Sequence, residues 1–169
     1  MIHETLSDGI DVSVVIPSSD GSRGGNVPLL LGDLRAQTFR DMELIVVVGV
    51  SPQGKAINQG AARAKGRILV VLDDDSRLCS TDVIASLVRV LDEHPDVGMV
   101  GASIVQPPGI NRLQRMAASE FPRFSMPVVS TITDSDMPCH GCCAFRKPVF
   151  DEVGGERETI VRGLDPDLR

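Results

Sequence analysis

The sequence predicts an α/β fold in which an open, mostly parallel sheet is flanked by helices on both faces. Three apolar runs, at residues 12–16, 44–48 and 68–72, are rich in β-branched residues and lack polar alternation. Strands buried on both faces of a parallel sheet have this pattern. Helical patterns lie between the runs, which favours right-handed β-α-β units. The 169 residues, of which 42% are hydrophobic and 24% charged, suffice for one globular domain.

The helices between these strands are predicted from apolar residues that recur at spacings of three and four. Residues 27–34 and 57–64 have this spacing, and the clearest stripe covers residues 81–93. Thr81 is a suitable N-cap for the third helix, and Pro95 lies just beyond its end. Each strand is therefore followed by a helix that can cover it.

The pattern is weaker in the second half of the chain. Residues 97–105 are expected to form a fourth strand, and residues 128–133 another. Short helices are expected at 111–119 and 148–153, the second begun by a proline and ended by two glycines. Residues 107–127 otherwise have no assigned structure.

Three segments that follow strands are expected to meet. Ligands of open α/β sheets bind beyond the carboxyl ends of the strands. Residues 17–26, 49–55 and 73–77 follow the three core strands. We therefore expect the functional site at the edge that these segments share.

Composition excludes several functions. The formal charge of −6 disfavours a nucleic-acid partner, and five Phe without Trp or Tyr disfavour an aromatic stacking platform. No apolar run is long enough to span a bilayer, and residues 1–11 are too polar for a signal peptide, although peripheral membrane association stays compatible. Cys139, Cys142 and Cys143 are too close together for a disulfide framework, which predicts reduced thiols and a cytoplasmic location.

Three aspartates, Asp73, Asp74 and Asp75, directly follow the third strand. Adjacent carboxylates in a partly desolvated place repel one another unless a cation compensates. Mg²⁺ and Mn²⁺ take oxygen ligands and leave coordination positions for phosphates. The alternative is that one aspartate caps a turn and the others are solvated.

Five segments together resemble the family 2 glycosyltransferases, which have the GT-A fold. They are Ser13 to Ser18, Leu34 to Val47 with its Gln-Thr-Phe, Asn58 to Gly66, Leu72 to Asp75, and Phe145 to Gly155. The resemblance implies a Rossmann-like nucleotide-diphospho-sugar transferase domain over residues 11–169, preceded by a tail at 1–10. We expect the domain to lack a C-terminal acceptor-binding portion.

The activity implied by this resemblance is inverting transfer of a sugar from a nucleotide-diphosphate sugar to a hydroxyl of an unknown glycan, lipid or small molecule. Asp73 and Asp75 would hold Mn²⁺ or Mg²⁺, and Asp165 would be the general base, supported by Asp167. From the residues alone, the last two read as a charged chain end. The residues implied in donor binding are Pro17, Ser18, Asp20, Asn58, Asp73, Asp74, His140 and Gly141.

Some positions depart from the family pattern. Residues 48–51 carry no acid where the family has base- and ribose-binding aspartates, Ile57 stands in place of an Arg, and Leu164 in place of a Glu. Asp20 could take over a donor contact or belong to a surface loop. A non-catalytic binding or scaffolding module with a degenerate donor site is therefore the alternative function. A nucleotidyltransferase is a third, disfavoured because no Gly-rich loop with Lys follows the first strand.

The cysteine cluster has two interpretations. Cys139, His140, Cys142 and Cys143 are residue types that bind zinc, but no second pair stands at a suitable spacing. Alternatively, the cysteines act as small apolar residues of a buried strand. By resemblance, His140 and Gly141 would line the donor sugar pocket.

Overall fold

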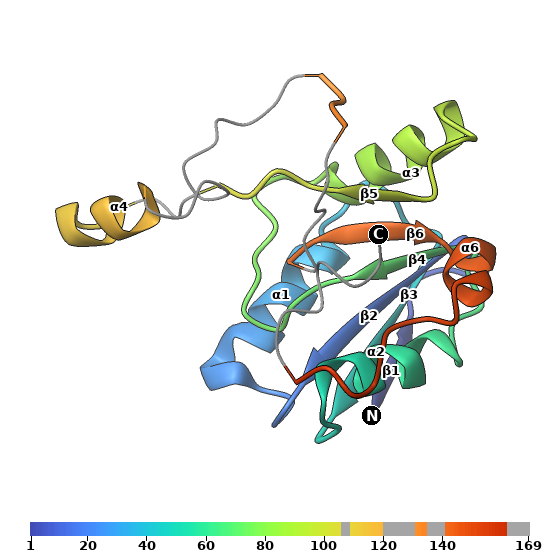
Figure 1. The fold of residues 1–169 in the computed structure, drawn as a ribbon, viewed down its shortest axis with the longest axis horizontal. Coiled ribbons are helices and arrows are strands. Elements are labelled where there is room, and N and C mark those ends of the chain that lie inside the picture. The colour runs from blue at the N-terminus through green and yellow to red at the C-terminus, as the bar shows by residue number, and fades with distance from the viewer. Residues whose placement is uncertain (106–108, 120–130, 135–140, 162–169) are drawn as a thin grey trace.

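The strands that the structure describes form one open sheet in the order β1-β3-β2-β4-β6-β5 (Figure 1). The computed structural model describes residues 1–105, 109–119, 131–134 and 141–161. The strands in these residues are β1 (Ile2–Thr5), β2 (Val12–Ser18), β3 (Met42–Val48), β4 (Ile68–Val71), β5 (Met99–Gly101) and β6 (Cys143–Arg146). The predicted α/β class is thereby confirmed.

The sheet is mixed, although most of its strands point the same way. β2 lies between β3 and β4 and is parallel to both. β6 is antiparallel to β4 on one side and to β5 on the other, so β5 runs in the direction of the central strands. β1 is antiparallel to β3 at the far edge. The central parallel strands bring their carboxyl ends to one edge.

Helices cover both faces of the sheet (Figure 1). In the described residues they are the short η1 (Arg23–Gly25), α1 (Asn26–Arg35), α2 (Gln53–Ala61), α3 (Val83–Glu93), α4 (Arg112–Ser119) and α6 (Lys147–Glu152). On β2, Val14 packs into the cluster formed with α1 and α3, whereas Val15 packs into the opposite cluster with α2 and α6. Both side chains are fully buried, as expected for a strand covered on both sides. None of the helices described is long and apolar enough to span a membrane.

Three segments differ from the strands that the sequence predicts. Residues 2–5, expected to belong to a tail, pair with β3 as the edge strand β1. Three of these four residues are exposed, so the strand lacks the apolar pattern that marks the buried ones. The strand expected at 97–105 is only three residues long, because β5 pairs with β6 over residues 99–101 alone. Of the strand expected at 128–133, residues 131–133 are not in a strand, and residues 128–130 lie outside the described residues.

Two glycines explain the close packing of α2 and the following turn on β2. A Cβ on Gly60 would lie 2.4 Å from Val15 Cγ1, and a Cβ on Gly66 would lie 2.7 Å from the backbone nitrogen of Ser13. Real Cβ atoms do not come this close, so both positions need glycine. Because the turn at Gly66 lies against β2, the strand that follows it, β4, is positioned beside β2.

A buried carboxylate joins three segments at the amino ends of the central strands. Glu43 of β3 is fully buried, and its Oε1 accepts hydrogen bonds from Ser13 Oγ at 2.6 Å and from the Lys65 backbone N–H at 2.7 Å. His3 Nε2 of β1 lies 2.6 Å from its Oε2. Burial alone would raise the pKa of Glu43, but these hydrogen bonds outweigh it and hold the pKa below its ordinary value.

We predict that Glu43 makes the fold sensitive to acid. Because its pKa is lower in the folded chain, its charged form contributes stability above the unfolded-state pKa, and this contribution is lost as the pH falls through the folded-state value. Glu43→Gln should lower the free energy of unfolding at pH 7 by about 1–2 kcal/mol and flatten its decline below about pH 4.5. Urea unfolding from pH 3 to 7 measures both. Glu93→Gln, on the exposed end of α3, is the control and should follow the wild type.

Candidate active site

An open cleft of about 320 Å³ lies at the carboxyl ends of β2, β3 and β4. The sequence predicts that residues 17–26, 49–55 and 73–77 meet at this edge, and all three segments contribute to the cleft, which confirms that they converge. The lining residues are Pro17, Ser18, Ser19, Arg23, Val50, Ser51, Gln53, Asp73, Asp74 and Asp75. Its size is in the range of small-molecule sites.

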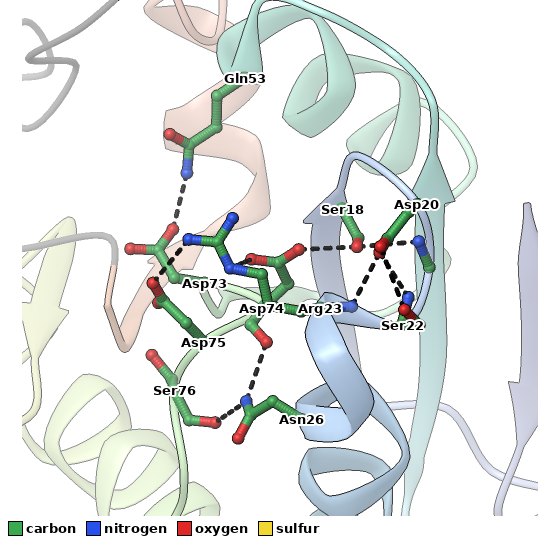
Figure 2. A network of polar contacts seen from close by, with 11 residues as sticks. Ser18, Asp20, Ser22, Arg23, Asn26, Gln53, Asp73, Asp74, Asp75 and Ser76 are labelled. Atoms are coloured by element: carbon green, nitrogen blue, oxygen red, sulfur yellow. Dashed lines mark hydrogen bonds and ion pairs between the residues drawn. The ribbon is translucent and has the colours of Figure 1, made fainter.

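The middle aspartate of the three, Asp74, faces inward. Its side chain is only 12% exposed, and its Oδ2 accepts a hydrogen bond from Ser18 Oγ at 2.7 Å (Figure 2). The side-chain amide of Asn26, at the start of α1, donates to the backbone carbonyls of Asp74 and Ser76, at 2.9 Å each. These contacts attach the acidic loop to β2 and α1 and hold its shape.

The outer two aspartates have polar partners on neighbouring loops. Gln53 Nε2, at the start of α2, donates to Asp73 Oδ1 at 2.6 Å. Arg23 Nη2 donates to Asp75 Oδ2 at 3.2 Å, and Arg23 Nε lies 3.5 Å from Asp74 Oδ1 (Figure 2). The side chain of Asp75 is 60% exposed and that of Arg23 is 51% exposed, so solvent reaches this ion pair. A surface pair of this kind is easily exchanged for another partner.

Asp20 organises the first loop of the site. Its Oδ1 accepts hydrogen bonds from the backbone N–H groups of Ser22 and Arg23, at 2.7 Å each, and its Oδ2 accepts one from Ser22 Oγ. The hydrogen bonds from these two residues lower the pKa of the Asp20 carboxyl. Arg23 has a φ of 45°, the left-handed region that most side chains avoid. Asp20 thus holds the backbone from which the Arg23 side chain reaches the cleft.

The other residues expected to bind the donor are not all at this cleft, and some lie outside the described part of the chain. The carbonyl of Gly141 accepts a hydrogen bond from Ser76 Oγ at 2.7 Å, which brings Gly141 beside the acidic loop. Asn58 is not among the residues that line the cleft. Its side-chain amide donates to the carbonyl of Glu156 at 2.8 Å and accepts from the same residue's N–H at 2.9 Å. Residues 135–140 and 162–169, and with them His140, Asp165 and Asp167, lie outside the described residues.

The cysteines have the surroundings expected of a buried strand. Cys143 begins β6 and is fully buried, Cys142 is half-buried, and neither forms a disulfide bond. In the described residues, no three His, Cys, Asp or Glu side chains are grouped so that they could hold a metal ion. Cys139 and His140, the other members of the zinc alternative, lie outside those residues. In β6, Cys143 packs with the core cluster around α2.

Arg23 and Gln53 are site residues that sequence reasoning did not single out. Both lie within the segments expected at this edge, after β2 and after β3. Their position after a strand was the available signal. Which polar residue of each loop contacts the aspartates depends on contacts between residues that are 20 or more positions apart in the sequence.

The acidic loop fits a divalent cation whose coordination is completed by a substrate. Asp73 and Asp75 provide carboxylate oxygens at the cleft, whereas Asp74 is engaged by Ser18. Mg²⁺ and similar hard cations are commonly bound by one or two carboxylates together with phosphate and water oxygens. Two protein ligands are therefore enough for a metal that also binds a diphosphate.

Three solved structures with a similar fold are GT-A glycosyltransferases. A mannosyltransferase, PcManGT from Pyrobaculum calidifontis, in complex with GDP-Man and Mn²⁺, has a TM-score of 0.66 and 18% identity over 96% of this chain and 51% of that one. Two structures of S. aureus TarS have 14% identity over 93% of this chain, with TM-scores of 0.61 for residues 1–349 and 0.60 for a longer chain. No curated protein matches the chain.

The family follows from the sequence match. Residues 50–154, more than half of the chain, match the model of glycosyl transferase family 2. The chain belongs to this family. It spans about half the length of the mannosyltransferase and of the shorter TarS chain.

Proposed function

We propose that this chain is the nucleotide-sugar-binding part of an inverting, metal-assisted glycosyltransferase. The observation that carries the proposal is the cleft at the carboxyl ends of three parallel strands, where Asp73 and Asp75 are lining residues. Such a cleft is the usual ligand site of an open α/β sheet. Family membership makes a nucleotide-diphosphate sugar the expected ligand.

In this proposal each acidic residue has its own role. Asp73 and Asp75 would hold Mn²⁺ or Mg²⁺, with Ser18 and Asn26 keeping the loop in shape through Asp74. The bound cation would supply positive charge against the diphosphate leaving group. Mn²⁺ together with GDP-Man in the Pyrobaculum mannosyltransferase supports this choice.

The proposed transfer is a single displacement. Asp165 takes the proton of an acceptor hydroxyl, whose oxygen attacks the anomeric carbon while the bond from that carbon to the nucleoside diphosphate breaks. One displacement inverts the anomeric configuration. Asp165 needs only to be ionised and within hydrogen-bond reach of the hydroxyl, so an ordinary carboxylate suffices. The acceptor, a glycan, lipid or small molecule, would bind beyond the donor.

A non-catalytic binding module is the second candidate, and two observations favour it. Val50 lines the cleft on the loop after β3, where resemblance implies acids that bind the base and ribose. Ile57, in place of the family's Arg, is fully buried in the core, so its side chain does not reach a ligand in the cleft. A nucleotidyltransferase would instead release pyrophosphate from a nucleoside triphosphate, and the family match disfavours it.

Thermal unfolding with UDP or GDP tests the proposal. If one of them binds with Mn²⁺ at 100 times its Kd, the folded state gains about 2.7 kcal/mol, which should raise the Tm by roughly 5–10 °C. Removing Mn²⁺ with EDTA should abolish the shift. AMP, which lacks the diphosphate, is the control. If neither UDP nor GDP shifts the Tm in the presence of Mn²⁺, the site does not bind a nucleotide-sugar donor.

A further inference from the structure

We propose that Arg23 is a movable counter-cation of this site: its guanidinium pairs with Asp74 and Asp75 when the cleft holds no cation, and turns to the diphosphate when a divalent cation binds. The inference rests on the proposed function and deepens it. It assigns a ligand-binding role to Arg23 of the first loop, whose side chain contacts Asp74 and Asp75 of the acidic loop (Figure 2).

The net charge of the cleft is negative, so an anionic ligand needs a cation beside it. Among the described residues that line it, three are aspartates and Arg23 is the only base, which leaves a formal charge of −2. A nucleoside diphosphate is itself an anion and would be repelled. Either a divalent cation has to bind together with the nucleotide, or the Arg23 guanidinium has to turn toward it.

The geometry of Arg23 makes the change of partner feasible. Its contact with Asp75 is a single hydrogen bond at 3.2 Å between two half-exposed side chains, and its Nε is 3.5 Å from Asp74. Exposed ion pairs of this kind contribute little stability. Asp74 would keep its hydrogen bond from Ser18 after Arg23 left. Departure of the guanidinium therefore leaves no buried charge without a partner.

A divalent cation on Asp75 would compete with the guanidinium for the same carboxylate. Arg23 donates to Oδ2 of Asp75, the side chain that we assign to the metal. Two cations close to one carboxylate repel each other, so metal binding would release the guanidinium. A guanidinium is a planar donor that can form two parallel hydrogen bonds to a phosphate. A diphosphate in the cleft would therefore be a suitable new partner for Arg23.

The backbone of the loop keeps the released side chain at the cleft. The N–H of Arg23 is bound to Asp20, and Ser22 is bound to both oxygens of the same carboxylate. The loop therefore stays attached while the side chain changes its partner. Arg23→Gln is the informative substitution, because it removes the charge and keeps a side chain at this positive φ.

The test measures two affinities of the full chain. Mn²⁺ alone is titrated by electron paramagnetic resonance of the free ion, and UDP or GDP is titrated by calorimetry at saturating Mn²⁺. Arg23→Gln should bind Mn²⁺ about two- to fivefold more tightly, because the competing cation is gone. It should bind the nucleotide about 10- to 100-fold more weakly, because a charge-assisted contact is lost.

Two variants are controls. Arg89→Gln removes the same charge from an exposed position on α3 and should leave both affinities as in the wild type. Arg23→Lys keeps the charge without the two-pronged donor, so its Mn²⁺ affinity should match the wild type and its nucleotide affinity should be intermediate.

Opposite changes in the two affinities support the proposal. If the wild type binds both ligands and Arg23→Gln leaves either affinity unchanged, or weakens both, the counter-cation role is wrong while the proposed function stands. If the wild type binds neither Mn²⁺ nor a nucleotide, the proposed function itself is contradicted.

Discussion

Replacing Asp75 with alanine is expected to weaken Mn²⁺-dependent binding of UDP or GDP by about 100-fold or more, because a metal with only two protein ligands loses one of them. The fold should be unaffected. The Asp75 side chain is 60% exposed, and its ion pair with Arg23 lies in solvent. The free energy of unfolding should therefore change by less than about 1 kcal/mol.

Calorimetry with Mn²⁺ and the nucleotide measures the loss of binding, and urea unfolding checks the fold. Asp151→Ala is the matched control. This aspartate is exposed on α6 and is paired with Lys147 across one turn, away from the residues that line the cleft. Equal nucleotide affinity in Asp75→Ala and the wild type would show that Asp75 is not a metal ligand.

Asp165→Asn should reduce release of nucleoside diphosphate from a nucleotide sugar by about 10²- to 10⁴-fold, the range that a general base contributes. Donor binding should stay within about twofold, because the amide keeps the shape of the carboxylate and the residue has no part in holding the metal in our proposal. A change in turnover without a change in affinity is the signature of a base.

The comparison is made on the chain's own turnover, with water or an added hydroxyl compound as acceptor. Asp151→Asn again serves as the control and should turn over like the wild type. Full activity in Asp165→Asn would require another base. Donor binding without any turnover in the wild type would favour the non-catalytic module.

The strands and the helix faces were predictable because their signals are local. Residues 12–16, 44–48 and 68–72 are apolar apart from Ser13, and they coincide with the strands β2, β3 and β4, of which β4 ends at Val71. The stripe of Ile84, Leu87, Val88 and Leu91 lies in the core, as predicted. β1 was not predictable, because its exposed residues carry no such period and only pairing with β3 makes them a strand.

The place of β6 in the sheet depends on contacts that no local pattern encodes. Cys143–Arg146 enters antiparallel between β4 and β5, although it follows β5 by some 40 residues along the chain. The sequence identified this segment as a candidate buried strand. Its neighbours and its direction are settled by the side chains of both strands beside it.

By itself the sequence determined the fold class, the buried strands, the family and the edge at which the acidic loop meets the loops after β2 and β3. These depend on apolar periodicity and on motifs contained within a few residues. Only the tertiary structure decided that Asp74 turns inward to Ser18, that Asp75 meets Arg23, and that Asn58 pairs with the backbone of Glu156. The partners of these side chains are about 50 to 100 residues away in the sequence. Which partners they contact therefore depends on how whole elements pack, and not on the residues adjacent in the sequence.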